Sequence, residues 1–140
     1  MASHNPPSHN PFVHNGASDA PSFLAIPAGF TIMGARLNNV TSTTIGSGVA
    51  TRLGFSALNR QSSTTVEAFR NGASIGTAAL ASTASVSQAI YIGAFNNNGT
   101  TYGFSTDRVA FASLGAGLTS TEQANFYSRV NTLLTGFGAN

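Results

Sequence analysis

Cysteine, lysine and tryptophan are absent from the 140 residues of this chain, and charged residues of any kind are scarce. Without cysteine there is no disulfide framework, no thiol nucleophile and no cysteine-based zinc site. Charged residues form 7% of the sequence, whereas an average soluble domain has about 25%. So few charges produce little repulsion between copies, and the composition therefore favours close assembly.

Other absences exclude further classes of protein. The six basic residues are arginines scattered singly along the chain, so the net charge of +2 does not predict a nucleic-acid interface. No run approaches the roughly 20 apolar residues of a membrane helix, and we expect no membrane insertion. The first ten residues lack the basic and apolar stretches of a signal peptide, so we expect release from a cell by lysis rather than by secretion.

The sequence also holds too few carboxylates to predict a catalytic pair. The four acids are Asp19, Glu67, Asp107 and Glu122. A glycosidase needs two carboxylates that face each other across about 5–10 Å. Glu67 has threonine and phenylalanine at its alternate positions, and Glu122 is better explained as a helix cap. We therefore expect a protein that is not an enzyme and that uses no cofactor.

Neutral hydrogen-bonding residues are abundant instead. Ser, Thr and Asn together number 46, and they suit strands and turns. Asn71-Gly72 separates two apolar runs and predicts a type I′ hairpin. Residues 90–95 are apolar on both faces, which is typical of a central strand or of one covered by a partner. The expected strands are Phe23–Ile26, Phe30–Ala35, Ala50–Ala57, Thr64–Arg70, Ser74–Ala79, Ala89–Phe95 and Arg108–Ser113.

One amphipathic helix is expected at about residues 119–136. Thr119 and Glu122 have the spacing of a capping box, in which each residue hydrogen-bonds the backbone of the other. Five apolar residues then fall on one helical face, which we expect to pack on the sheet. They are Phe126, Val130, Leu133, Leu134 and Phe137.

Residues 1–22 differ from the rest, and we expect them to form an extended arm that precedes a single domain at residues 23–140. A decaying five-residue repeat places proline and histidine at regular intervals, and proline disfavours packed elements. The residues expected to dock this arm on a neighbouring subunit are His4, Pro6, Pro7, His9, Pro11 and Phe12. His4, His9 and His14 could bind a transition metal if symmetric copies met. We favour exposed histidines and no metal site.

The second half of the chain resembles a known family in the order and spacing of its motifs. The resemblance rests on residues 66–72, 90–99 and 108–118 and on the capped helix, and it covers roughly residues 50–137. These motifs resemble the concanavalin A-like, laminin-G-like jelly-roll domains of tailed-bacteriophage and prophage proteins. The resemblance implies an all-β, jelly-roll-like antiparallel β-sandwich with one C-terminal helix. The N-terminal half is shorter than in that family, so either the sandwich is trimmed or a neighbouring subunit completes it.

The resemblance also raises the question of ligands. Sugar binding would use amides for the hydroxyl groups and an aromatic ring for stacking. The candidates are Arg36, Asn38, Asn39, Asn96, Asn97, Asn98 and Tyr102. The three consecutive asparagines and Asp107 are also the nearest approach to a calcium site, but a tight turn explains them better.

We expect the chain to be a structural protein of a bacteriophage virion, assembled in the host cytoplasm. It would be a capsid decoration, a head fibre or a tail-associated domain, with other copies of itself and other virion proteins as partners. The alternative is a carbohydrate-binding adhesin that recognises a glycan on the host surface. A polysaccharide-degrading enzyme is disfavoured by the small number of carboxylates.

Overall fold

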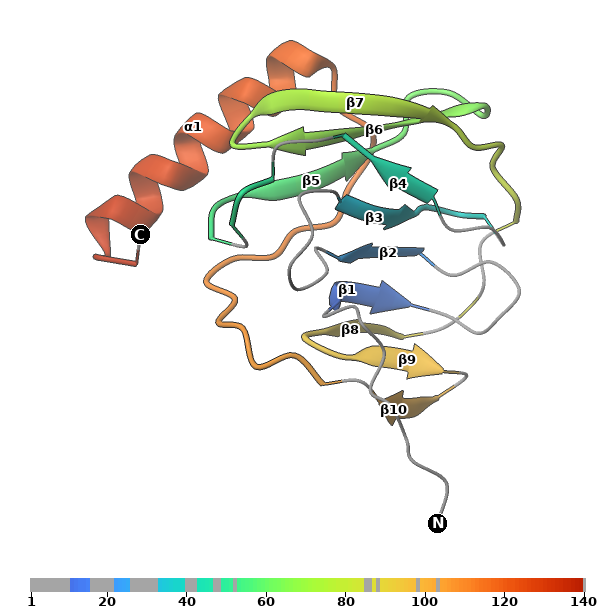
Figure 1. Ribbon diagram of the computed structural model, residues 1–140. Coiled ribbons are helices and arrows are strands. Elements are labelled where there is room, and N and C mark those ends of the chain that lie inside the picture. The colour runs from blue at the N-terminus through green and yellow to red at the C-terminus, as the bar shows by residue number, and fades with distance from the viewer. Residues whose placement is uncertain are drawn as a thin grey trace.

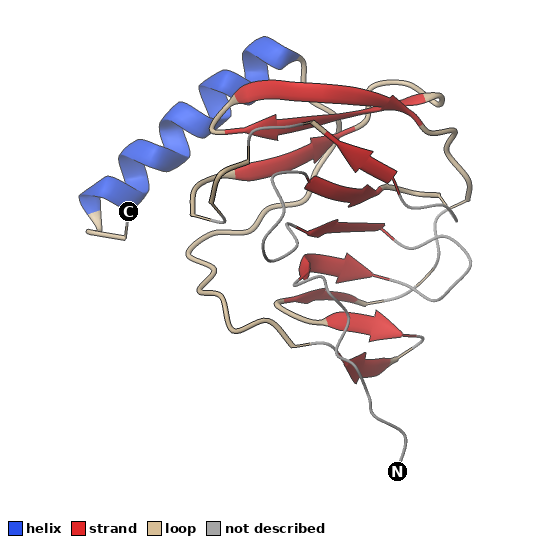
Figure 2. Cartoon of the chain, in the orientation of Figure 1, coloured by secondary structure: helices blue, strands red, loops and turns tan. Residues whose placement is uncertain are grey.

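The computed structural model describes residues 11–15, 22–25, 33–39, 43–46, 49–51, 53–84, 87, 89–97, 99–102 and 104–139. Within them the chain consists mainly of short strands in antiparallel sheets, followed by one C-terminal helix (Figures 1 and 2). In Figure 1 the strands follow one another from β7 at the top to β10 at the bottom. The β-rich prediction with a terminal helix is therefore confirmed.

The largest sheet has five strands in the order β4-β3-β2-β1-β8, and every neighbouring pair is antiparallel. The strands are β1 (Pro11–Asn15), β2 (Ser22–Ala25), β3 (Met33–Arg36), β4 (Thr43–Ile45) and β8 (Ile90–Ile92). A separate hairpin follows β8 and pairs β9 (Phe95–Asn97) with β10 (Thr100–Tyr102).

A second sheet has three strands in the order β5-β6-β7. They are β5 (Ser56–Asn59), β6 (Thr65–Arg70) and β7 (Ala73–Ala79). Asn71 and Gly72 connect β6 to β7 with φ values of 48° and 78°. Two consecutive positive φ angles define the type I′ turn that the Asn-Gly dipeptide predicts.

The hydrophobic core lies between β3 and β4 of the larger sheet and β6 of the smaller one. Met33 and Ala35 alternate on β3, Val66 and Ala68 alternate on β6, and all four are completely buried. Alternate residues of a strand share a face, so each strand turns one apolar face to the other sheet. Ile45, Val49 and Leu80 complete this cluster.

The helix α1 (Ser120–Gly136) packs on the sheet of β5, β6 and β7. It begins with the predicted capping box, since the N–H of Glu122 donates to the Thr119 hydroxyl at 3.2 Å and Glu122 Oε2 accepts from the Thr119 N–H at 2.7 Å. The rings of Phe126 and Tyr127 lie 5.9 and 5.7 Å from the ring of Phe55. These aromatic contacts hold the first half of the helix.

The apolar helix face was predicted to pack on the sheet along its whole length, and this is wrong for its second half. Val130 is buried, but Leu133 is 51% exposed and Phe137 is 76% exposed. In Figure 1 the C-terminal end of α1 extends beyond the strands, so these side chains have no sheet beneath them.

Two predicted strands differ from the structure in length. Of the described residues of the predicted strand Ala50–Ala57, only Ser56 and Ala57 are in strand conformation. Just before them, the guanidinium of Arg70 donates to the carbonyl oxygens of Thr51, at 2.9 Å, and of Leu53. The side chain of Arg70, rather than the backbone of a neighbouring strand, therefore binds these carbonyl groups. The predicted strand Ala89–Phe95 is divided into β8 and β9, because the chain bends at Gly93, where φ is 78°.

The predicted strand Arg108–Ser113 is also wrong, because the structure shows no strand between Tyr102 and α1. The chain instead crosses from β10 to α1 in an irregular path (Figure 2).

The predicted arm at residues 1–22 needs a correction in its centre. Pro11–Asn15 are extended, as predicted, but they form β1, which pairs with β2 on one side and with β8 on the other. They are part of the sheet rather than an arm that precedes it. Proline is tolerated at the first residue of a strand, where Pro11 lies. His4, Pro6, Pro7 and His9 lie outside the described residues, as do positions 16–21.

Candidate functional site

The most unusual surface of the molecule is an apolar region around β8. Ile90 and Ile92 alternate on this short strand, so both point to one side, and they are 41% and 54% exposed. Phe104, two residues after β10, is 72% exposed. These three side chains line an open hollow of about 400 Å³ together with Tyr91, Ala94 and Thr101. Isolated exposed apolar residues are ordinary, whereas several of them around one hollow are a candidate interaction surface.

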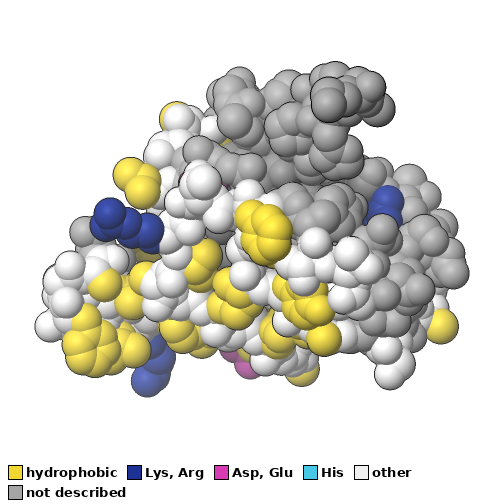
Figure 3. Space-filling model, turned by 90° about the horizontal axis from the view of Figure 1, so that it is seen from below, with side chains coloured by type: hydrophobic (Ala, Val, Ile, Leu, Met, Phe, Trp, Pro, Cys, Tyr) yellow, Lys and Arg dark blue, Asp and Glu magenta, His cyan; other side chains and the backbone are white. Residues whose placement is uncertain are grey.

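Figure 3 views the molecule from the β10 end. Hydrophobic side chains recur across this face, with few charged ones between them. The apolar pattern of residues 90–95 had left two explanations open, a central strand or one covered by a partner. Among the described residues β8 is the last strand in the order of its sheet, so it is not a central strand there.

Further exposed apolar side chains occur in a connecting segment, which we define as residues 108–116. Val109 and Leu114 of this segment are 38% and 68% exposed. The segment is held in place at both ends. Before it, the N–H of Ser105 donates to the Gly93 carbonyl at 2.7 Å, and the Ser105 hydroxyl donates to Asp107 Oδ2 at 3.1 Å. Asp107 is therefore a turn residue, as its sequence context had suggested.

After the connecting segment, the buried side chain of Asn59 binds both backbone groups of Leu118. Asn59 Oδ1 accepts from the Leu118 N–H at 2.9 Å, and Asn59 Nδ2 donates to the Leu118 carbonyl. Gly117 passes so close to β5 that a Cβ atom there would lie 2.3 Å from the Arg60 carbonyl oxygen. These contacts fix the start of α1 relative to the smaller sheet.

Two arginines serve the interior of the molecule rather than its surface. The guanidinium of Arg60 donates to the carbonyl oxygens of Leu37 and Leu80, each at 2.6 Å. Arg70 donates to the Ser56 hydroxyl at 2.5 Å as well as to the carbonyls before β5. Burial lowers the pKa of both arginines. Both guanidinium groups are therefore held by backbone and hydroxyl oxygens of their own chain.

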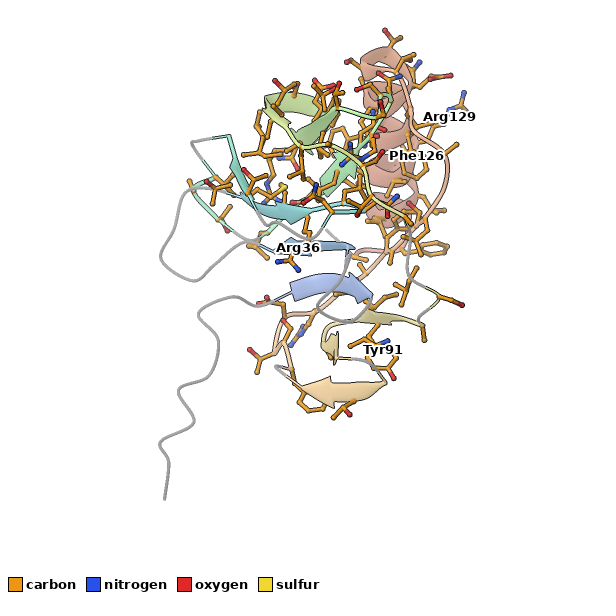
Figure 4. All side chains as sticks on the ribbon, turned by 90° about the vertical axis from the view of Figure 1, so that its right-hand side faces the viewer. Arg36, Tyr91, Phe126 and Arg129 are labelled. Atoms are coloured by element: carbon orange, nitrogen blue, oxygen red, sulfur yellow. The ribbon has the colours of Figure 1, made fainter. Side chains whose placement is uncertain are left out.

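The predicted sugar-binding residues fall into two groups that the structure does not bring together. Arg36, Asn38 and Asn39 lie at the end of β3, whereas Asn96, Asn97 and Tyr102 belong to the β9–β10 hairpin. Strands β2 and β1 lie between β3 and β8, and a strand occupies about 4.8 Å of a sheet. In Figure 4, Arg36 and Tyr91 lie on opposite sides of β1.

Two of the predicted amides have structural partners. Asn96 is completely buried, its Nδ2 donates to the Ala89 carbonyl at 2.6 Å, and its Oδ1 accepts from the Gly99 N–H at 2.7 Å. Asn39 is buried and donates to the Ala81 carbonyl. The carbonyl of Asn38 accepts from the Thr83 N–H at 2.7 Å. Asn98 lies outside the described residues, as do the side chains of Asn97 and Tyr102.

Catalytic and metal-binding groups are sparse in the part of the chain that the structure describes. Glu122 is occupied by the helix cap, and the hydrogen bonds from Thr119 lower the pKa of its carboxyl group. No group of three or more His, Asp or Glu residues within the described ranges could hold a metal ion. His4 and His9 lie outside those ranges, and so does the side chain of His14, so the metal hypothesis stays untested.

The chain was compared with protein families, with curated proteins and with solved structures. None of these matches it. Within the described residues, α1 is neither long nor apolar enough to span a membrane. The sequence resemblance to phage jelly-roll domains therefore stays a prediction, and inferences about function rest on the surface itself.

Proposed function

We propose that this chain is a non-enzymatic structural protein that works by assembling into multimers. The proposed setting is a bacteriophage virion, where the chain would be a capsid decoration, a head fibre or a tail-associated domain. The sheets would correspond to a jelly-roll-like sandwich of the concanavalin A-like kind. The setting and the sandwich are supported by the motifs at residues 66–72, 90–99 and 108–118, and the mode of action is supported by the apolar hollow.

The observation that carries the proposal is the exposure of Ile90, Ile92 and Phe104 around one hollow. Full burial of a side chain of this size contributes about 1.5–3 kcal/mol. Burial of the parts of Ile90, Ile92 and Phe104 that are exposed contributes on the order of 3–5 kcal/mol. Association itself costs about 4–15 kcal/mol. A single contact is therefore weak, and stable binding needs many copies that hold one another.

The low surface charge supports the same conclusion. Repulsion between like-charged subunits is a common obstacle to close assembly. Here Arg60 and Arg70 bind backbone carbonyls of their own chain, and Glu122 caps its own helix. With 7% charged residues in the whole chain, and these three held by internal hydrogen bonds, repulsion between copies is small.

The carbohydrate-binding alternative receives less support from the described residues. Asn39 and Asn96 donate their amide hydrogens to backbone carbonyls of the same chain, so they do not present them to a ligand. The two predicted groups of ligand residues are also separated by two strands. A glycan site would need other residues.

The experiment is to compare Ile92→Ser and Phe104→Ser with the unchanged chain by light scattering over a range of concentrations. We expect both variants to dissociate at concentrations where the unchanged chain is multimeric. The matched control is Leu53→Ser, which removes a leucine that is 82% exposed on a different element. If all three variants dissociate equally, or if none of them dissociates, the hollow is not the assembly surface.

A further inference from the structure

The connecting segment has the residue pattern of a strand but pairs with no strand among the residues that the structure describes. The large side chains of Val109 and Phe111 alternate with the small ones of Ala110 and Ala112, so in a strand the large ones would share one face. In the structure this stretch belongs to no sheet. The local pattern and the observed conformation disagree, and a missing partner explains the disagreement.

The backbone of the connecting segment is available for pairing. Among the described residues, no backbone N–H or carbonyl group of residues 108–116 takes part in a hydrogen bond. Only Phe111 of these residues is partly buried, through a ring contact with Phe126 at 5.9 Å. The chain bends at Ala110. Because no hydrogen bond holds this bend, the segment can straighten without breaking one.

The geometry points to a second copy of this chain as the partner. Residues Arg108–Ser113 of one subunit pair in antiparallel fashion with Arg108–Ser113 of another, and this adds a strand contact to the apolar hollow. The inference rests on the proposed function, and it names the segment that joins two subunits.

A two-fold symmetric antiparallel pair must place one residue opposite its own copy. When Ala110 takes that position, Val109 of each copy lies opposite Phe111 of the other. Pairs of an aromatic and a β-branched residue are among the favourable cross-strand pairs. When Phe111 takes the central position, one pair of Phe111 with its own copy replaces the two Val109–Phe111 pairs, and Val109 lies opposite Ser113. The register centred on Ala110 is therefore favoured.

Charge is also compatible with self-pairing. In this register Arg108 lies opposite Ala112, and the two copies of Arg108 lie at opposite ends of the pair. No like charges face each other, which would destabilise a pair of strands. A segment with several charges of one sign would repel its own copy and favour a partner of opposite charge. Residues 108–116 contain a single charged residue, Arg108, so this repulsion is small.

Because the chain contains no cysteine, the register can be tested with a single introduced thiol. Directly opposed residues in an antiparallel pair have Cα atoms about 4.5–5.5 Å apart, and this is within the reach of a disulfide. We expect Ala110→Cys to form a covalent dimer under mild oxidation. Ala116→Cys is the matched control, because it places the thiol on the same exposed segment but outside the pair.

A charge-exchange experiment tests the same contact without a covalent bond. Ala110→Asp places two carboxylates opposite each other, and Ala110→Arg places two guanidinium groups there. We expect each variant alone to be monomeric by light scattering and a mixture of the two to form dimers. The corresponding changes at Ala116 should leave the assembly unaltered.

The outcomes separate this inference from the proposed function. A multimeric chain in which Ala110→Cys cross-links no faster than Ala116→Cys, and in which Ala110→Asp stays multimeric, would overturn the pairing and leave assembly through the hollow intact. An unchanged chain that is monomeric at every concentration would overturn both. Covalent dimers formed by Ala110→Cys, together with dimers of the mixed charge variants, would support both.

Discussion

Asn59 and Leu118 are joined through both groups of the asparagine side-chain amide. Oδ1 accepts from the Leu118 N–H at 2.9 Å, and Nδ2 donates to the Leu118 carbonyl, so the side chain of β5 replaces a neighbouring strand at this point. The contact lies directly before the capping residue Thr119. It therefore determines where the connecting segment ends and where α1 begins.

Asn59→Ala should destabilise the subunit, because it removes both partners of Leu118. The loss of a buried hydrogen-bonding partner costs about 1–3 kcal/mol, and we expect a decrease of that size in the free energy of unfolding measured in urea. Asn59→Asp retains the acceptor but turns a second carboxylate oxygen toward the Leu118 carbonyl at a buried position, so near neutral pH it should destabilise at least as much as Asn59→Ala. Asn125→Ala, at an exposed position of α1, is the control and should have little effect. Equal stability of the Asn59 and Asn125 variants would contradict the role of Asn59.

Gly117→Ala should also destabilise the subunit, for a steric reason. A Cβ atom at position 117 would lie 2.3 Å from the Arg60 carbonyl oxygen, which belongs to the backbone and cannot turn aside. We expect a loss of roughly 1–3 kcal/mol in the free energy of unfolding, as for other overpacked sites. Gly115→Ala provides a control two residues away, since a Cβ atom there meets nothing within 4 Å. If both variants unfold at the same urea concentration, the close contact at Gly117 is not present in solution.

The capping box predicts a specific dependence of stability on pH. Hydrogen bonds from Thr119 lower the pKa of Glu122 in the folded chain. A carboxyl group with a lowered folded pKa stabilises the fold above its unfolded pKa of about 4.3, and this contribution is lost as the pH falls through the folded value. We expect urea midpoints to decrease below about pH 4.5 through this group. Glu122→Gln should remove that component, because a glutamine still caps the helix but does not titrate.

Thr119→Ala should reduce stability at all pH values. Replacement of a threonine at the N-cap costs about 1 kcal/mol, and the carboxyl group of Glu122 loses its hydroxyl partner at the same time. Circular dichroism at the helix wavelength, followed through a urea titration at neutral and at acid pH, measures both effects. An unchanged midpoint at neutral pH would show that the cap does not stabilise α1.

The parts of the fold that depend on local signals could be predicted from the sequence. The Asn71-Gly72 turn and the Thr119–Glu122 box each require particular residues at fixed spacing, and both are present in the structure. The strand predicted at residues 50–57 failed because Arg70, distant in sequence, binds its carbonyls. The strand at residues 108–113 failed because strand pattern alone supplies no partner.

The candidate surface was only partly visible in the sequence. The apolar pattern of residues 90–95 indicated either a central strand or a partner, and only the strand order could decide between them. Phe104 belongs to no recognisable sequence motif. It lies just after the end of β10, where it lines the hollow. Asn96 was a candidate ligand because an asparagine amide can either bind a sugar or stabilise a tight turn. In the structure its amide stabilises the turn, through hydrogen bonds to Ala89 and Gly99.

The mass of the full chain in solution tests the central claim most directly. Sedimentation equilibrium over the micromolar range would measure it without a variant, a label or a ligand. Our account predicts multimers whose average mass increases with concentration, because each contact of the apolar hollow is weak by itself. A single monomeric mass at every concentration would contradict the account and leave the exposed side chains of Ile90, Ile92 and Phe104 to some other use.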